Sequence, residues 1–399
     1  MRVMRLTIVG AGPGSPELLT GMALRRLQEA GVIYYTAERL KKSIPDMQEK
    51  AVYLPYKTLV ETLLRKEAQR PVLLVSGDVG FYSISSALKE RLPDWDLEYI
   101  NGLSSLQVLC ARAGVPYDRV KVASVHGRSL PPVPLASYNE WTFFLTGGDK
   151  RANHVLKELT QAGLGHVRAW VGENLTMPDE RLLEGTASSL AEELFASLAV
   201  VLLHNSAWTD PFVTLRDDGF ARGKAPMTKE EIRAVSLARL SVRPGDVCYD
   251  VGAGTGSVSV AMAYLAREGM VYAIERKEEA FRLLEENRRK LGAFNVVPVL
   301  GAAPEAVEGL PAPDCVFIGG SGGDLGRIIA SVLQKNPNAR FVVNAITLET
   351  LQESVTCLEQ AGISPEISCI SCARAELAGR YHMMKAQNPV YVISGRAHG

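Results

Sequence analysis

A run of seven residues in the second half of the sequence combines an acid with three glycines. This run, Asp250-Val251-Gly252-Ala253-Gly254-Thr255-Gly256, follows the apolar residues 247–249 and precedes a helix-like segment, 257–267. Glycine lets the backbone approach a ligand where a side chain would block it. A strand, a glycine turn and a helix in this order are typical of a loop that binds a nucleoside cofactor.

A second acid stands where such a cofactor would need one. Glu275 ends the next apolar run, 270–274, and lies about 20 residues beyond the loop, which suits hydrogen bonds to a ribose diol. Glycines are also common in purely structural turns, so the triplet alone would leave that interpretation open. The triplet, the acid before it and Glu275 together favour a nucleoside cofactor.

Three more glycine loops follow apolar runs in the first half. They are Gly10-Ala11-Gly12-Pro13-Gly14, Ser76-Gly77-Asp78-Val79-Gly80 and Asn101-Gly102-Leu103-Ser104-Ser105. Each alone is compatible with an ordinary turn. Open parallel sheets bind ligands beyond the carboxyl ends of their strands, so three such loops at successive strand ends predict a second site. No acid follows the first loop at the ribose spacing, and Pro13 stiffens it, so this is not a dinucleotide fingerprint.

The composition narrows the class of protein. A chain of 399 residues with 47% hydrophobic residues and 35 glycines fits a folded α/β enzyme of two or three domains. Lys and Arg number 44, as do Asp and Glu, which argues against a nucleic-acid partner. The first residues lead straight into a strand, so we expect no signal peptide. The apolar run 198–203 is too short to span a bilayer, so we expect no membrane partner and a cytoplasmic location.

The six cysteines are scattered, which favours a reduced protein. Cys369 and Cys372 have C-x-x-C spacing but lie in a strand-like run without a second pair. This favours structural cysteines over zinc or redox chemistry, and we expect no metal site.

The pattern of elements predicts two α/β domains. Residues 1–205 are expected to form one domain, with later strands at 141–145, 167–171 and 199–203. Residues 206–226 lack periodicity and are expected to be a linker, so that the halves fold separately and a fragment starting at Ala225 binds cofactor. Residues 227–399 alternate strands with helices, which predicts a parallel, doubly wound sheet. Its later strands are expected at 270–275, 296–300, 314–318 and 340–345, with a last pair near 366–372 and 389–394.

A helix start is expected just after the linker. Thr228 is followed three residues later by Glu231, which predicts a capping box and a helix that runs to about Leu240.

The glycine loops of the first half, in their order, resemble those of the tetrapyrrole methylases of cobalamin and siroheme biosynthesis. The motifs at 124–128, 145–148 and 172–175 are similar to the branch that acts on precorrin-6Y. This chain departs from many relatives at Ser15 and Val79, where Asp and Pro are common. The resemblance implies a two-lobed fold that binds S-adenosylmethionine. It places the cofactor against Pro13, Gly77, Asp78, Val79, Ser104 and Ser105, and His126 and Arg128 towards the substrate; an ordinary turn histidine is the alternative for His126.

The second half resembles the Rossmann-like S-adenosylmethionine methyltransferases. The segments 227–233, 318–323 and 344–350 are similar to the decarboxylating subunit that acts on precorrin-6Y. Residues 319–321, Gly-Gly-Ser, replace the Asn/Asp-Pro-Pro-aromatic motif of many base and amine methyltransferases. The resemblance places the cofactor against Thr228, Gly252, Ala253, Gly254, Thr255, Gly256, Glu275 and Ala303.

Together the two resemblances imply a fused enzyme with two cofactor sites per chain. Such an enzyme methylates precorrin-6Y at carbons 5 and 15, decarboxylates the ring C acetate and yields precorrin-8X; homo-oligomers, dimeric or tetrameric, are expected. Arginine and lysine suit the carboxylates of a tetrapyrrole, and the candidates are Arg128, Arg374, Arg380 and Lys385. A solvated surface charge is the alternative for each.

Three alternatives stay open at this stage. A nicotinamide enzyme could share the glycine loop. An RNA methyltransferase would need a basic face, which the balanced charge disfavours. A non-catalytic S-adenosylmethionine-binding scaffold would not need two intact sets of loops.

Overall fold

The computed structural model describes residues 4–65, 67–126 and 130–396, which form two compact units. Unit 1 comprises the described residues of Met1–Ser129, Trp141–Lys157 and Val167–His204. Unit 2 comprises those of Leu130–Glu140, Glu158–His166 and Asn205–Gly399. Within the described residues, no helix is long and apolar enough to cross a bilayer.

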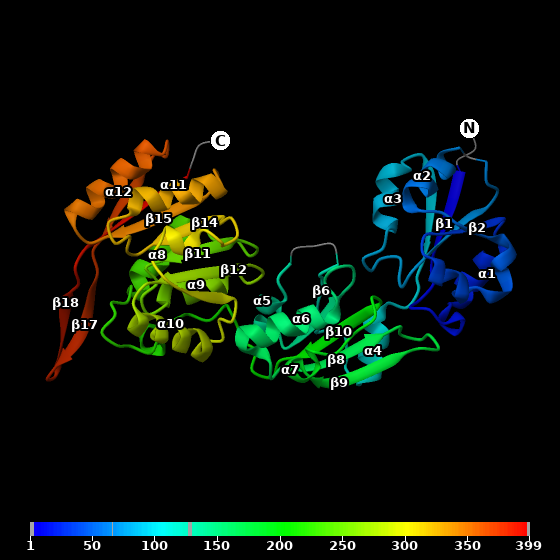
Figure 1. Ribbon diagram of the computed structural model, residues 1–399, viewed down its shortest axis with the longest axis horizontal. Coiled ribbons are helices and arrows are strands. Elements are labelled where there is room, and N and C mark those ends of the chain that lie inside the picture. Colours follow the sequence, from blue (N-terminus) through cyan, green and yellow to red (C-terminus); the bar gives the residue numbers. More distant parts are fainter. Residues whose placement is uncertain (1–3, 66, 127–129, 397–399) are drawn as a thin grey trace. The chain divides into compact units, whose positions relative to one another are not determined.

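The first sheet of unit 1 has five parallel strands in the order β3-β2-β4-β1-β5. Its elements are β1 Met4–Gly10, α1 Gly21–Glu29, β2 Val32–Tyr35, β3 Ala51–Tyr53, α2 Tyr56–Leu64, β4 Pro71–Val75, α3 Ser85–Arg91 and β5 Trp95–Ile100. Figure 1 labels β1 and β2 of this sheet and the helices α1, α2 and α3 around it. Leu6 and Ile8 of β1, an interior strand, are fully buried, as in a parallel sheet covered on both faces. Because β4, β1 and β5 are neighbours, their three glycine loops leave the same edge of the sheet.

The second sheet of unit 1 is mixed, in the order β6-β7-β10-β8-β9. Only β6 and β7 pair in parallel. The strands are β6 Lys121–Ser124, β7 Trp141–Leu145, β8 Arg168–Glu173, β9 Arg181–Thr186 and β10 Ala199–His204, accompanied by α4 Ser105–Ala113, α6 Ala152–Leu159 and α7 Ala187–Leu190. The three predicted strands are β7, β8 and β10. The sequence did not predict β6 and β9, because β6 is only four residues long and β9 is an edge strand without a buried face.

Unit 2 is built on a seven-stranded sheet in the order β13-β12-β11-β14-β15-β19-β16. Its strands are β11 Val247–Val251, β12 Met270–Glu275, β13 Val296–Leu300, β14 Cys315–Ile318, β15 Arg340–Ala345, β16 Glu366–Ile370 and β19 Val390–Arg396. Its helices are α5 Pro132–Tyr138, α8 Glu230–Leu240, α9 Ser257–Leu265, α10 Glu278–Lys290, α11 Leu325–Lys335 and α12 Leu348–Gln360. The predicted strands are therefore confirmed, although β19 runs antiparallel to both its neighbours.

Short helices complete the chain. They are η1 Pro16–Leu18, η2 Glu38–Ser43, η3 Pro45–Lys50, η4 Thr160–Leu164, η5 Asp217–Gly219 and η6 Glu305–Val307.

Two local expectations about unit 2 were wrong or incomplete. The predicted capping box is absent from the described start of α8, where Lys229 is the cap residue and no side chain bonds the first turn. Glu231 instead bonds Arg374, as shown below. A hairpin of β17 Ala373–Ala378 and β18 Tyr381–Ala386 also lies between β16 and β19, outside the main sheet.

The segment expected to be a linker packs within unit 2. Phe220 and Asp217 are each 4% exposed. The Nη1 of Arg233 lies 3.3 Å from the Oδ1 of Asp217, and its guanidinium lies over the Phe220 ring. The Ala221 backbone N–H donates to the side-chain amide oxygen of Asn287. A fragment starting at Ala225 would lose all of these contacts.

Unit 2 also contains a helix from the first half of the sequence. Tyr138, in α5, is 5% exposed and belongs to the core under β11 and β12. Its hydroxyl donates to the Oδ1 of Asn295 over 2.6 Å, and its ring meets the edge of the Tyr264 ring. Asn295 uses its amide hydrogens on backbone carbonyls between α9 and β12, so this hydroxyl satisfies its oxygen.

Tyr138→Phe should therefore destabilise unit 2. The substitution leaves the buried oxygen of Asn295 without its donor, which costs about 1–3 kcal/mol. Denaturant unfolding of the full chain, followed by a probe in unit 2, should show a lower midpoint. Tyr117→Phe, at a tyrosine that is 51% exposed, is the matched control and should leave the midpoint unchanged. Equal midpoints for both variants would contradict the role of this hydrogen bond.

Candidate functional site

A cavity of about 950 Å³ opens at the carboxyl ends of β11, β12, β14 and β15 in unit 2. The predicted cofactor residues on its wall are Thr228, Gly252, Ala253, Gly254, Glu275 and Ala303. Thr255 and Gly256 lie deeper: Thr255 is 1% exposed, and a Cβ on Gly256 would meet the Leu284 side chain at 2.4 Å. These two residues therefore shape the loop from behind.

The glycine loop is held against the strand ends on both sides. Gly252 has a φ of +75°, and a Cβ added to it would lie 2.7 Å from the carbonyl oxygen of Gly320, beyond β14. The backbone N–H groups of Gly252 and Ala253 both donate to the carbonyl of Ile274, at the end of β12. Only glycine allows this approach of three strand ends.

Glu275 is 7% exposed and organises this end of the sheet. Its Oε2 accepts the Gly254 N–H and its Oε1 accepts the Lys277 N–H, both over 2.8 Å. The carboxylate therefore fixes the glycine loop and the start of the loop before α10. Each oxygen has a further lone pair, so the carboxylate can also accept hydrogen bonds from a diol in the cavity.

Asp250, the acid before the glycine loop, is 1% exposed and borders the cavity. Burial, with a smaller contribution from the charge of Glu275, raises the pKa of this carboxyl to about 7 against the opposing hydrogen bond from Ser259. Its Oδ1 has no hydrogen-bond partner within the described chain. The carboxyl is thus a half-satisfied polar group. Because its pKa is about 7, its protonation changes near neutral pH.

Asp250→Asn should change how stability depends on pH. In the unfolded chain an aspartate ionises near pH 3.9, but in the folded protein Asp250 keeps its proton to about pH 7. Between these values the folded protein binds a proton that the unfolded chain has released, so stability falls as the pH rises through this window. Asparagine cannot ionise. The melting temperature of the variant minus that of the wild type, without cofactor, should therefore increase from about pH 5 to about pH 8. A difference independent of pH would contradict the shift.

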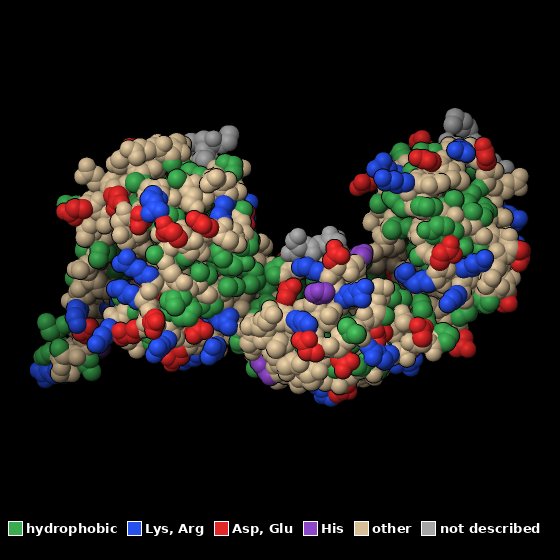
Figure 2. Space-filling view, viewed as in Figure 1, with side chains coloured by type: hydrophobic (Ala, Val, Ile, Leu, Met, Phe, Trp, Pro, Cys, Tyr) green, Lys and Arg blue, Asp and Glu red, His purple; other side chains and the backbone are tan. Residues whose placement is uncertain are grey.

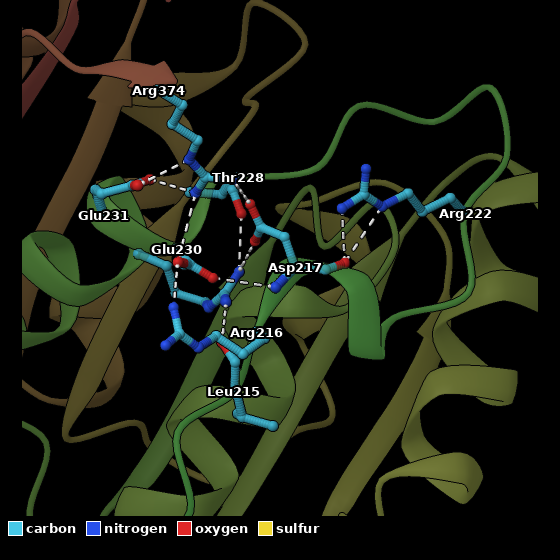
Figure 3. A network of polar contacts seen from close by, with 9 residues as sticks. Leu215, Arg216, Asp217, Arg222, Thr228, Glu230, Glu231 and Arg374 are labelled. Atoms are coloured by element: carbon cyan, nitrogen blue, oxygen red, sulfur yellow. Dashed lines mark hydrogen bonds and ion pairs between the residues drawn. The ribbon is translucent and has the colours of Figure 1, made fainter. Parts of the chain in front are cut away.

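A network of charged side chains surrounds Thr228, which lies on the cavity wall (Figure 3). Arg374, from the hairpin, donates two hydrogen bonds to the Glu231 carboxylate, one from Nε over 2.8 Å and one from Nη2. Its Nη1 lies 3.1 Å from the Oδ2 of Asp217. Hydrogen bonds with Glu231, supported by Asp217, raise the pKa of Arg374, while the same bonds lower the pKa of Glu231. Arg233 donates to the carbonyl of Thr228 over 2.9 Å. The network therefore fixes the loop that carries Thr228.

The predicted substrate residues of unit 2 separate into three cases. Arg374 lines the cavity but is paired with carboxylates. Lys385 also lines it and lies 3.1 Å from Glu376. Arg380 does not line this cavity; it lies between β17 and β18, where its Nε donates to the Tyr381 hydroxyl. The pairings of Arg374 and Lys385 could not be predicted, because Glu231 lies far along the chain and Glu376 lies across the hairpin.

The three glycine loops of unit 1 meet at one point. A Cβ on Gly10 would lie 2.6 Å from both the Gly77 carbonyl oxygen and the Gly102 nitrogen. Asp78 joins the second and third loops, since its Oδ2 accepts the Gly102 N–H over 3.2 Å and the Asn101 side-chain amide over 3.1 Å. The structure therefore brings together loops that lie up to 92 residues apart in the sequence, at the edge where a parallel sheet binds its ligand.

The other predicted cofactor residues of unit 1 surround this point in different ways. Ser104 caps α4, accepting the Gln107 N–H, and Ser105 is half-buried in the first turn of that helix. Val79 is buried in the core of the first lobe, so only its backbone can face a ligand. Pro13 is half-buried in the first loop.

His126 is exposed and lies beside the loop after β7. A Cβ on Gly147 would lie 2.6 Å from its Nδ1. Two motifs of the sequence, at 124–128 and 145–148, therefore meet at this histidine. Arg128, the other predicted substrate residue of unit 1, lies outside the described residues.

Sequence reasoning missed the buried pair of Asp217 and Arg233. The pair lies 16 residues apart, across the end of an aperiodic segment and the first turns of α8. Charged residues without periodicity predict a solvated segment, so no sequence signal marked them as buried. The cavity residue Arg276 was also missed, although it directly follows Glu275.

Comparison with known proteins gives two family matches and several relatives. Residues 5–191 match the model for tetrapyrrole (corrin/porphyrin) methylases, and residues 218–396 match the model for a precorrin methyltransferase domain. The "Probable cobalt-precorrin-6B C(15)-methyltransferase (decarboxylating)" of Pyrobaculum calidifontis is 42% identical over 194 residues, which are 47% of this chain and 100% of that protein. The precorrin-6Y C(5,15)-methyltransferase [decarboxylating] of a Sinorhizobium species is 28% identical over 392 residues, 96% of this chain and 94% of that protein. A solved precorrin-6Y C5,15-methyltransferase structure from Geobacter metallireducens has 39% identity, covers 47% of this chain and 97% of its own, and has a TM-score of 0.45.

Proposed function

Because the chain belongs to the family of decarboxylating precorrin methyltransferases, we propose that it methylates precorrin-6Y at carbons 5 and 15 and removes the carboxylate of the ring C acetate, giving precorrin-8X. The observation that carries this function is the presence of two separate glycine-loop sites in one chain, one in each family's fold. Two sites would let each methyl transfer use its own aligned donor, one in each domain.

S-adenosylmethionine is the methyl donor at both proposed sites, and when bound it supplies a methyl group on a sulfonium. In unit 2 its site would be formed by the cavity residues Thr228, Gly252, Ala253, Gly254, Glu275 and Ala303, and Glu275 would accept hydrogen bonds from its ribose. In unit 1 its site would be formed by Pro13, Gly77, Asp78, Val79, Ser104 and Ser105. Nucleophilic ring carbons need alignment more than acid–base catalysis, and alignment contributes roughly 7–11 kcal/mol. The rigid backbone contacts at Gly10 and Gly252 suit that task.

The two domains divide the reaction. The relative of half this length is named for methylation at carbon 15 and decarboxylation, and the precorrin methyltransferase model covers residues 218–396. We assign both of these steps to the C-terminal domain and methylation at carbon 5 to the N-terminal domain. In decarboxylation, the bond between the acetate methylene and its carboxylate breaks, CO2 leaves, and the electron pair enters the conjugated ring. A proton from solvent then converts the methylene to a methyl group.

Mass spectrometry of the product tests this function. Full-length chain incubated with precorrin-6Y and methyl-labelled S-adenosylmethionine should add two labelled methyl groups and lose one CO2. Titration calorimetry with S-adenosylhomocysteine should give a stoichiometry near two per chain. A fully active protein that binds one molecule of S-adenosylhomocysteine would overturn the two-site assignment. A protein that binds two molecules but leaves the tetrapyrrole unchanged would overturn the assignment of the substrate.

The β17–β18 hairpin supports a homo-oligomer. Leu377, Tyr381, Met383 and Met384 are each more than 60% exposed, and Figure 2 shows hydrophobic side chains gathered on this hairpin. An isolated two-stranded hairpin is marginal in water, and exposed apolar side chains beside unpaired strand edges mark an interface. A second copy of the chain, dimeric or tetrameric, is the proposed partner, and sedimentation of the full chain measures it. No nucleic-acid or membrane partner is proposed, and the six free thiols suit the cytoplasm.

A further inference from the structure

The cations on the wall of the unit 2 cavity differ in whether their charge is already used. Arg374 and Lys385 pair with carboxylates of the protein. Arg276 is exposed, lines the same cavity, and makes no hydrogen bond or ion pair with any residue the structure describes. A guanidinium without a protein partner can offer its full planar fork to a ligand carboxylate.

The side chain of Arg276 reaches across the site. The residue follows β12, yet its Nη1 would lie only 2.8 Å from a Cβ placed on Gly322, which follows β14. In the sheet, β11 lies between β12 and β14. The guanidinium must therefore pass over the end of β11, where the glycine loop begins at Gly252. This places an unpaired positive charge on the cavity wall, close to the loop that follows β14.

Gly322 and Gly323 leave room around this charge. Both have positive φ, +65° and +97°, and a Cβ on Gly322 would meet the guanidinium, whereas a Cβ on Gly323 would meet no described atom within 4 Å. The absence of a side chain at Gly322 therefore lets the arginine approach the loop closely.

We propose that Arg276 binds a peripheral carboxylate of the tetrapyrrole and so holds the ring over the methyl donor in the C-terminal domain. The assignment rests on the proposed function, which supplies a substrate rich in carboxylates. Arg276 is favoured over Arg374 and Lys385, because those two would have to give up their own ion pairs. The lysines of the same wall, Lys224, Lys229 and Lys277, lack the planar fork of a guanidinium.

The carboxylate that Arg276 binds is one that remains in the product. Loss of CO2 removes negative charge from the departing carboxylate as its electron pair moves into the ring. A cation on that group would stabilise the ground state more than the transition state and would slow the reaction. The departing acetate should instead face a wall without unpaired cations, such as that of Asn344, Ile346 and Val390.

Equilibrium binding of precorrin-6Y to the full chain, saturated with S-adenosylhomocysteine and followed by absorbance, tests the assignment. Arg276→Gln should weaken tetrapyrrole binding at the C-terminal site by about tenfold or more, as expected for a charge-assisted hydrogen bond. Arg276→Lys keeps the charge but not the planar fork, so its affinity for the tetrapyrrole should lie between those of the wild type and Arg276→Gln. Gly322→Ala should reproduce part of the loss by displacing the guanidinium. Arg282→Gln, an exposed arginine on α10 paired with Glu278, is the matched control and should bind as the wild type does.

Two results would overturn the assignment. The first is unchanged tetrapyrrole affinity in Arg276→Gln. The second is a loss of S-adenosylhomocysteine affinity by the same factor with tetrapyrrole binding intact, which would place Arg276 on the cofactor's own carboxylate. Because binding is read without turnover, wild-type protein that binds the tetrapyrrole but releases no CO2 would count against the proposed function and not against Arg276.

Discussion

Gly252→Ala should abolish cofactor binding in the C-terminal domain and leave the N-terminal site intact. The added methyl would lie 2.7 Å from the Gly320 carbonyl oxygen and 2.9 Å from the Gly320 nitrogen, both backbone atoms that cannot swing away. The φ of +75° adds about 1–2 kcal/mol of strain for any residue with a Cβ. The loop must therefore move out of the position in which Gly254 meets Glu275.

Calorimetric titration with S-adenosylhomocysteine measures the outcome. The stoichiometry should fall from two per chain to one, and the product of precorrin-6Y should gain a single methyl group and keep its ring C acetate. Gly10→Ala should produce the opposite single-site protein, because its methyl would meet the backbone of two other loops at 2.6 Å. Gly245→Ala, where no atom lies within 4 Å, is the control. A stoichiometry of two S-adenosylhomocysteine molecules per chain in Gly252→Ala would contradict the placement of the cofactor.

Glu275→Gln should weaken cofactor binding at the C-terminal site by about tenfold or more. Both carboxylate oxygens already accept backbone N–H groups, from Gly254 and Lys277. Glutamine turns one of these acceptors into an amide donor, so one N–H loses its partner and the glycine loop loosens. Hydrogen bonds to a charged group are worth roughly 1.5–3 kcal/mol, and about 1.4 kcal/mol is a factor of ten in affinity.

The N-terminal site supplies an internal reference for this variant. Its affinity for S-adenosylhomocysteine should stay unchanged, because its loops lie in unit 1. Glu278→Gln, at an exposed acid in the first turn of α10, controls for loss of charge near the cavity. If Glu275→Gln bound as tightly as Glu278→Gln, the acid would be a loop anchor without a role in cofactor binding.

Much of the fold was predictable because its signals are local. Buried parallel strands are continuous apolar runs, and the glycine loops directly follow them, so β11, β12 and the three loops of unit 1 could be read from neighbouring residues. The ends of parallel neighbours share one edge of the sheet, so the clustering of the Gly10, Gly77 and Gly102 loops also followed.

What could not be predicted depends on partners distant in the sequence. Asp217 is buried only because Arg233 and Arg374 neutralise it, and Arg374 comes from a hairpin 157 residues further on. Glu231 has the spacing of a capping residue, but a better partner in the same hairpin takes it away from the helix start. The pairing of Arg374 likewise removes a cation that composition alone would assign to the substrate.

The position of Tyr138 in the core of unit 2 has a consequence for synthesis of the chain. All seven residues of α5 are buried, yet Asn295, the partner of Tyr138, is translated 157 residues later. At roughly 5–20 residues per second, the ribosome needs about 8–30 s to deliver that partner. During this interval the core of unit 2 that buries α5 is incomplete, so the apolar side chains of α5 are exposed. We expect a chaperone to bind such a segment and aggregation to compete with folding. Fusion of the two halves in one chain supplies α5 to the rest of unit 2 at high local concentration.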